Sequence, residues 1–263
     1  MYSKEHKNYL KKLRVNRILT ISIQIFIVLV GIIIWQILAD KEIINPFISS
    51  SPKQILETII GLHNDKNLYQ HIGTTIYETF LSFSLGTLIG SLIAIILWWY
   101  PFVAKVVDPF LTVLNSLPKV ALGPIIIIWA GAGIESIIIM ALLISVIITI
   151  INVYQGFIEI DYNKMKLMQS FKASKWQILV KLLLPGSFAS IISTLKINVS
   201  MSLIGVIMGE FLVSKKGFGY LIMYGSQVFN LNLVMTGVII LCLVATIMYY
   251  LVNYIEKKVI KNK

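Results

Sequence analysis

The chain has 263 residues, of which 57% are hydrophobic and 13% charged, and its mean hydropathy is +0.83. Several separate apolar runs reach about 20 residues, enough for a helix to cross a bilayer, so an ordinary soluble domain is excluded. The net charge of +11 comes from segments between and beyond these runs, a pattern typical of membrane topology rather than nucleic-acid binding. The single cysteine, Cys242, excludes a disulfide framework and a thiolate metal site.

Residues 1–17 form a basic tail in which six lysines and arginines face one acid, Glu5. This excess predicts a cytoplasmic amino terminus. The apolar run Ile18–Leu38 is longer than a signal-peptide core, and no A-x-A-like cleavage site follows it. We therefore expect it to remain attached as the first transmembrane helix.

The rest of residues 18–74 is expected to lie outside the membrane. Ser51-Pro52-Lys53-Gln54 resembles a capping box with proline at the first helical position. It predicts a short amphipathic helix along the outer interface, with its apolar residues on one side: Ile55, Ile59 and Leu62.

Five further spans are predicted, giving an all-α membrane protein of about six helices with both termini in the cytoplasm. Ser82, Gly86 and Gly90 repeat every four residues in the second span, which favours close helix packing. The third span is punctuated by prolines and is expected to be broken beside a solvated route. Its prolines are Pro109, Pro118 and Pro124, and the other expected spans are Thr75–Trp99, Ile134–Val153, Ser187–Leu212 and Leu231–Leu251, before a basic cytoplasmic tail at 256–263.

No catalytic or metal-ligating pattern occurs in the sequence. The three histidines form no H-E-x-x-H motif, and there is neither a G-x-S-x-G elbow nor a phosphate loop, so this chain cannot hydrolyse ATP by itself. Glu78, Glu135 and Glu210 are placed near the ends of spans, which gives little support for a proton relay. Energy for transport against a gradient is therefore expected from another protein.

A long polar stretch, Asp161–Pro185, interrupts the apolar runs between the fourth and fifth spans. Asp161 is expected to cap one short helix, and Ser174-Lys-Trp-Gln177 is a capping box that opens a second helix. Its lysines predict a cytoplasmic location. We call this segment the elbow. Residues at helical spacing form an apolar stripe that either binds a partner or packs on the chain's own helices: Met165, Leu167, Met168 and Phe171.

Here the sequence resembles a known family, the permeases of binding-protein-dependent ABC importers. Ser170-Phe-Lys-Ala-Ser174-Lys-Trp-Gln177-Ile is similar to the S-L-G-A-S-R-W-Q-I of the family's cytoplasmic coupling loop, and Leu182-Leu-Leu-Pro185 to its closing V-V-L-P. The motifs Leu114–Pro124, Ile128–Gly133 and Gly209-Glu210-Phe211, followed by Gly217–Ile222, resemble the nitrate/sulfonate/taurine branch.

The resemblance implies that residues 75–255 form the permease core. It also implies a second permease copy, two ATPase subunits that hold ATP and Mg²⁺, and an external solute-binding protein; this chain holds no cofactor itself. Residues implied to couple to the ATPase are Lys164, Met165, Lys166, Leu167, Met168, Phe171, Lys172, Ser174, Trp176, Gln177 and Pro185. Lys166-Leu-Met168 stands where the family has E-A-A, and Lys172 where it has glycine; the loss of glycine matters less if residue 172 does not need positive φ.

A solute pathway is harder to assign. Small and polar residues at spacings of four, four, three and four form one face of the fifth span, which either packs or lines the pathway. Lys119 is expected either to attract an anion or to snorkel, and Lys196 to snorkel. The residues assigned to the pathway are Asn115, Pro118, Lys119, Thr194, Asn198, Ser202, Gly205 and Gly209.

The leading interpretation is a multi-pass permease of the cell membrane, the translocation subunit of an ATP-driven importer for a sulfonate-, taurine- or nitrate-like anion or a vitamin-precursor-like solute. The alternatives are an ATP-independent carrier or channel and a membrane assembly protein.

Overall fold

The computed structural model describes residues 4–65 and 67–261, and these contain helices and no strand. Five long helices are apolar enough to span a membrane. They are α1 (Lys4–Asp40), α4 (Asn67–Trp99), α7 (Ile134–Ile158), α11 (Phe188–Val213) and α13 (Leu231–Lys261). The predicted all-α polytopic fold is confirmed.

The proline-punctuated span is broken, as predicted. Helix α5 (Pro101–Ser116) and the segment made of a 3-10 turn (Lys119–Leu122) and α6 (Gly123–Ala130) meet at 86°, and together they would be the sixth span. Pro118 lies between the two parts and has an extended backbone that cannot continue α5.

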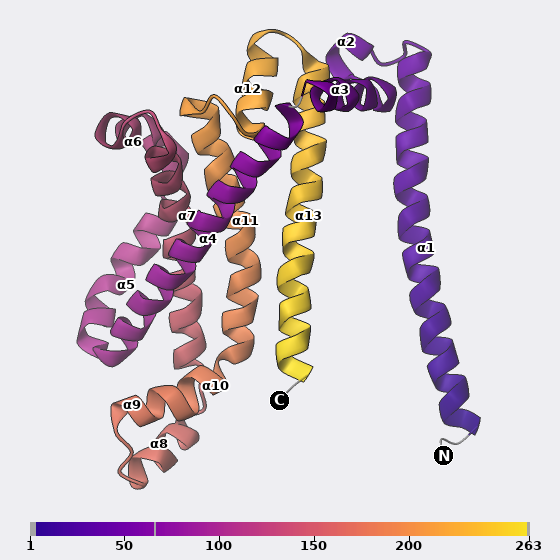
Figure 1. The fold of residues 1–263 in the computed structure, drawn as a ribbon. Coiled ribbons are helices and arrows are strands. Elements are labelled where there is room, and N and C mark those ends of the chain that lie inside the picture. Colours follow the sequence, from indigo (N-terminus) through magenta and orange to yellow (C-terminus); the bar gives the residue numbers. More distant parts are fainter. Residues whose placement is uncertain (1–3, 66, 262–263) are drawn as a thin grey trace.

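Both termini lie at the same end of the molecule, beside α8 (Tyr162–Ser170) and α9 (Lys175–Ile178) of the elbow (Figure 1). A π-helical segment (Leu179–Leu183) and α10 (Leu184–Gly186) connect the elbow to α11. The opposite end carries α2 (Pro46–Ser49), α3 (Pro52–Asn64), α6 and α12 (Phe218–Gln227) (Figure 1). We call these the elbow end and the loop end. This arrangement agrees with the prediction that both termini lie on the same side of a membrane. Their location in the cytoplasm stays a prediction.

Helix α3 lies across the loop end, where the amphipathic helix was expected (Figure 1). Ser51 Oγ accepts a hydrogen bond from Gln54 N–H at 3.3 Å, and Pro52 is the first helical residue. Ile55 is buried, and Ile59 and Leu62 pack on the apolar cluster of α12 and α13. The predicted apolar side of this helix is therefore confirmed.

Helix boundaries differ from the expected ones mainly where charged or polar residues continue a helix. Helix α1 begins at Lys4 rather than near Ile18, because no Gly or Pro interrupts the basic tail and Lys and Arg favour helix. Helix α4 begins at Asn67, eight residues before Thr75, and α13 continues through the basic tail to Lys261. Helix α1 stands apart: no residue of its apolar window is buried by the rest of the chain (Figure 1).

The core is a close contact of α7 with α4 on one side and α11 on the other. A Cβ added to Gly90 of α4 would lie 2.6 Å from Thr149 Cβ, and one added to Gly209 of α11 would lie 2.8 Å from Ile137 Cα. Small residues allow backbones in a membrane to approach this closely, where dispersion contacts and hydrogen bonds must hold helices together. The packing interpretation of the Ser82-Gly86-Gly90 stripe is confirmed.

We expect Gly90→Ala to destabilise the protein and Gly73→Ala in the same helix to leave it unchanged or slightly stabilised. An added methyl at residue 90 overlaps Thr149, and overpacking of this kind costs about 1–3 kcal/mol. Gly73 has no atom within 4 Å of its added Cβ, and alanine favours helix by about 1 kcal/mol over glycine. Thermal unfolding in detergent would compare the two; equal midpoints would contradict the packing role of Gly90.

Candidate functional site

The elbow consists of two capped helices, as the sequence predicts. Asp161 Oδ1 accepts the N–H of Asn163 at 2.8 Å and begins α8. Before α9, Ser174 Oγ accepts Gln177 N–H at 3.3 Å while Gln177 Oε1 accepts Ser174 N–H at 2.8 Å. This reciprocal pair is a complete capping box, so the position of α9 is set by local sequence.

The apolar stripe of the elbow divides into two faces. Met165 and Met168 are half-buried and pack on an internal cluster that includes Phe157 of α7 and Leu179. Leu167 and Phe171, one helical turn apart, point outward with 56% and 75% of their surface exposed. The sequence placed these four residues in one stripe, but only its outward half is available to a partner.

Trp176 joins this outward face from α9 and is 64% exposed. We define the elbow face as Leu167, Phe171 and Trp176. Lysines surround it: Lys166 Nζ lies 4.6 Å from the centre of the Tyr162 ring, and Lys175 Nζ donates to the Trp99 carbonyl at 3.1 Å. The second contact attaches the elbow to the end of α4.

Lys172 occupies the position where the resembling family has glycine, and its φ is +55°. The hydrogen bonds around it form a Schellman motif, with Ala173 N–H donating to the Met168 carbonyl at 3.1 Å and Lys172 N–H to the Gln169 carbonyl at 2.8 Å. Residue 172 therefore does take the left-handed conformation that favours glycine. A lysine there costs of order 1 kcal/mol.

The face of α11 assigned to a pathway is buried inside this subunit. Asn198 Nδ2 donates to Thr87 Oγ1 of α4 at 2.6 Å, Gly205 meets Ala141 and Gly209 meets Ile137 of α7. Ser202 has no exposed surface, and Thr194 has 3%. Packing therefore describes most of this face in this conformation, and its assignment to a solute pathway stays a prediction.

The remaining pathway candidates lie at the bend between α5 and α6. Asn115 and Pro118 are exposed, and Lys119 Nζ donates to the Asn115 carbonyl at 2.8 Å, which satisfies the end of α5. Lys196, expected to snorkel, instead forms an ion pair with Glu256 of α13 at 2.5 Å. Its charge is therefore neutralised within the chain.

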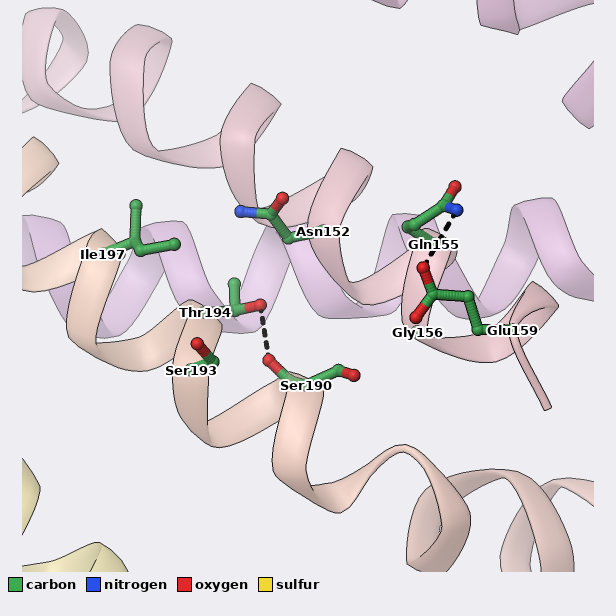
Figure 2. Close-up of a pocket in the computed structure, with 8 residues that line it drawn as sticks. All are labelled: Asn152, Gln155, Gly156, Glu159, Ser190, Ser193, Thr194 and Ile197. Atoms are coloured by element: carbon green, nitrogen blue, oxygen red, sulfur yellow. Dashed lines mark hydrogen bonds between the residues drawn. The ribbon is translucent and has the colours of Figure 1, made fainter.

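A polar groove between α7 and α11 was missed by sequence reasoning (Figure 2). Its volume is about 210 Å³. Helix α7 contributes Asn152 and Gln155, Glu159 follows directly after α7, and α11 contributes Ser190, Ser193 and Thr194. Gln155 Nε2 donates to Glu159 Oε1 at 3.2 Å, and Thr194 Oγ1 donates to the Ser190 carbonyl at 2.8 Å. The spacing of Asn152, Gln155 and Glu159, three and then four residues, is the signal that could have identified it.

A second polar cluster, at the loop end, was also missed. His71, Thr75 and Glu78 lie on one side of α4 and face Glu210 of α11 and the loop before α12. Thr75 Oγ1 donates to Glu210 Oε1 at 2.7 Å. The N–H groups of residue 217 and of the first two residues of α12, 218 and 219, donate to His71 Nδ1, Thr75 Oγ1 and Glu210 Oε2 at 2.9, 3.0 and 2.5 Å. Glu78 and Glu210, taken from sequence as separate residues near span ends, are buried together.

We expect Lys172→Gly to strengthen the elbow turn and Lys172→Ala to leave it no stronger, because both remove the lysine charge but only glycine relieves the positive φ. The expected gain is about 1 kcal/mol in local stability, measured as slower hydrogen exchange of the amides in the 168–175 peptide. Equal protection in the two variants would mean that the turn is not strained.

Comparison with known proteins assigns the family. Residues 86–261 match the family described as "Binding-protein-dependent transport system inner membrane component". A probable ABC transporter permease protein of Haemophilus influenzae is 27% identical over 231 residues, which cover 88% of this chain and 94% of that protein. The putative aliphatic sulfonates transport permease SsuC of Bacillus subtilis is 26% identical, over 88% of this chain and 83% of that protein. The taurine transport permease TauC of Escherichia coli is 23% identical, over 88% of this chain and 85% of that protein.

Among solved structures, the MetNI methionine ABC transporter in an inward-facing form has a similar fold, with a TM-score of 0.59 and 15% identity. The likeness covers 75% of this chain and 94% of that one. The family match covers residues 86–261, and the chain has several helices long and apolar enough to span a membrane. The chain therefore belongs to the binding-protein-dependent transport inner membrane components and is a multi-pass permease subunit of an ABC importer.

Proposed function

We propose that this permease passes a small solute from an external binding protein to the cytoplasm by ATP-driven alternating access. The observation that carries the proposal is the elbow face of Leu167, Phe171 and Trp176, an exposed apolar surface on a capped pair of helices. These apolar side chains lie among lysines at the elbow end, where both termini also lie. Such a surface is suited to docking a cytosolic partner. We assign that partner as the ATPase subunit, with ATP and Mg²⁺ held there.

The same proposal includes a second copy of this chain and an external solute-binding protein. We place the elbow in the cytoplasm on the basis of its lysines and the basic termini. Relatives are named for transport of aliphatic sulfonates, taurine, formylaminopyrimidine and riboflavin. The solute class that we propose is accordingly a small sulfonate-like anion or a vitamin-precursor-like molecule.

Movement of the elbow would reach the membrane helices through two contacts. Met165 and Met168 pack on the cluster that joins the elbow to α7, and Lys175 bonds to the end of α4. Because α7 is packed tightly between α4 and α11, a displacement at the elbow would be carried along the helices as rigid bodies.

We assign the groove of Figure 2 to the inward part of the solute route. Polar side chains such as Asn152 and Ser193 are unfavourable facing lipid and are favourable beside water or solute. The groove shares only Thr194 with the face of α11 that the sequence assigned to the pathway.

The buried carboxyl groups of Glu78 and Glu210 are the observation that favours the alternative, an ATP-independent carrier, because carriers hold coupling ions on such groups. Reconstitution in vesicles separates the two. The proposal expects uptake only with the ATPase and binding protein added; uptake by this chain alone would establish the carrier instead, and no flux in either case would favour an assembly role.

We expect Phe171→Asp to abolish co-purification of the ATPase without unfolding the permease. Loss of a central apolar contact at an interface costs about 2 kcal/mol or more, roughly thirtyfold in affinity. Phe229→Asp is the matched control, because Phe229 has the same 75% exposure but lies at the loop end. Met168→Asp should instead lower thermal stability, since Met168 packs inside. Retention of the ATPase by Phe171→Asp would contradict the docking surface.

For the groove, we expect Ser193→Leu to reduce solute uptake several-fold while ATPase binding is unchanged, because leucine fills the polar space between α7 and α11. Ser22→Leu, at an exposed serine of α1, is the control and should transport normally. Uptake is measured in reconstituted vesicles, and equal rates in the two variants would remove the groove from the route.

A further inference from the structure

The carboxyl pair at the loop end, Glu78 of α4 and Glu210 of α11, is buried to an unusual degree. The two residues are 3% and 1% exposed. Thr75, about one turn before Glu78 on α4, donates to Glu210 Oε1, so the two carboxyl groups lie beside each other between α4 and α11. A carboxylate can only accept hydrogen bonds, so a bond between two carboxyl groups requires a proton on one of them.

No cationic side chain forms an ion pair with either carboxyl group in the part of the chain that the structure describes. Among the residues that the structure describes, the one ion pair is Lys196–Glu256, which belongs to other helices. Lys215 and Lys216 are exposed at the rim of a cavity of about 360 Å³ that Glu78 also lines. Two adjacent negative charges in an apolar interior would repel strongly and would lack solvation.

The two oxygens of Glu210 already have partners. Oε1 accepts from Thr75 Oγ1 at 2.7 Å and Oε2 from Gly219 N–H at 2.5 Å, which favours the ionised form for Glu210. Glu78 Oε2, by contrast, has no partner among the described atoms although it is buried. The proton therefore belongs on Glu78, which donates toward Glu210.

We propose that Glu78 and Glu210 form a proton-binding site, in which one shared proton holds residues 215–219, the loop and the first residues of α12, against α4 and α11. This site lies beyond the transport function proposed above and does not depend on which solute is carried. Loss of the proton would place a second charge next to the carboxylate that accepts the Gly219 N–H, and so would loosen the loop. The same loop borders the cavity lined by Lys215 and Lys216, so the proton would control this mouth of the permease.

Other titratable groups face the pair and define the pH range of the test. They are His71 on α4, Lys215 and Lys216, which line the same cavity as Glu78, and Tyr220 on α12, which stacks on His71; Glu135 follows the cavity-lining Ile134 at the start of α7. His71 Nδ1 accepts the Gly217 N–H at 2.9 Å, so protonation of that nitrogen at acid pH would also break a loop contact. The measurements are therefore made at pH 7 and above, where histidine is ordinarily neutral and this loop contact is intact.

The first measurement is infrared spectroscopy of the full-length protein in lipid at pH 7 to 8. Wild type should show the C=O stretch of a buried protonated carboxyl group. Glu78→Gln and Glu210→Gln should each lose it, because the remaining carboxylate accepts from the amide and needs no proton. Glu135→Gln, at an exposed carboxylate of the same end, should keep it.

The second measurement is thermal unfolding of the same proteins between pH 7 and 9. The folded wild type binds one proton more than the unfolded chain, so its stability should fall with rising pH, by up to about a tenfold loss in the folding equilibrium constant per pH unit while the folded protein holds that proton, and the slope should flatten once the proton is released. Both glutamine variants should lose this slope, and Glu135→Gln should keep it.

The proposal would be overturned if wild type lacked the infrared band of a protonated carboxyl group, or if both glutamine variants kept that band. It would also be overturned if added sodium or calcium ions stabilised wild type at constant pH, because the pair would then be a cation site. If neither glutamine variant folds, two measurements on wild type still test the proposal. Absence of the infrared band, or absence of the fall in stability with rising pH, would exclude the shared proton.

Discussion

The packing of α7 between α4 and α11 is the constraint on which the rest of the structure depends. Gly90 and Gly209 let the backbones approach until an added methyl group would overlap the neighbouring helix. Without hydrophobic exclusion from water to drive association, such contacts must provide stability within a membrane. They also fix the register of three helices, and therefore decide which polar residues meet at each end of the bundle.

The two ends use that shared register for different chemistry. At the elbow end, α7 and the start of α11 form the polar groove and support an elbow whose apolar face remains uncovered. At the loop end, α4 and α11 bring Thr75, Glu78 and Glu210 together under the loop before α12. Packed helices slide as rigid bodies between discrete arrangements rather than deforming gradually. A rigid core can therefore transmit a movement of one end of the molecule to the other end across the membrane.

Features governed by local sequence were predictable, and those governed by tertiary contact were not. The caps at Ser51 and Ser174 and the break at Pro118 depend on residues within one turn, and each occurs where expected. The elbow stripe was only half right, because helical spacing groups residues but cannot say which side the protein itself covers. The loss of glycine at residue 172 was expected to matter less if that residue did not need positive φ, and this condition is not met, because the backbone hydrogen bonds of the Schellman motif set a positive φ there.

The meeting of Glu78 and Glu210 could not be read from the sequence, because 131 intervening residues separate them and each alone looks like a residue near a span end. Their difference from Lys196 is instructive. Lys196 also lies within an apolar helix, and the fold supplies Glu256 as its counter-ion. The carboxyl pair has like charges instead and receives hydrogen-bond donors from one side only. Lys196 and Glu256 are only partly buried and neutralise each other, whereas the fully buried Glu78 and Glu210 have one means of neutralisation, a proton, and a proton can be exchanged without moving a helix.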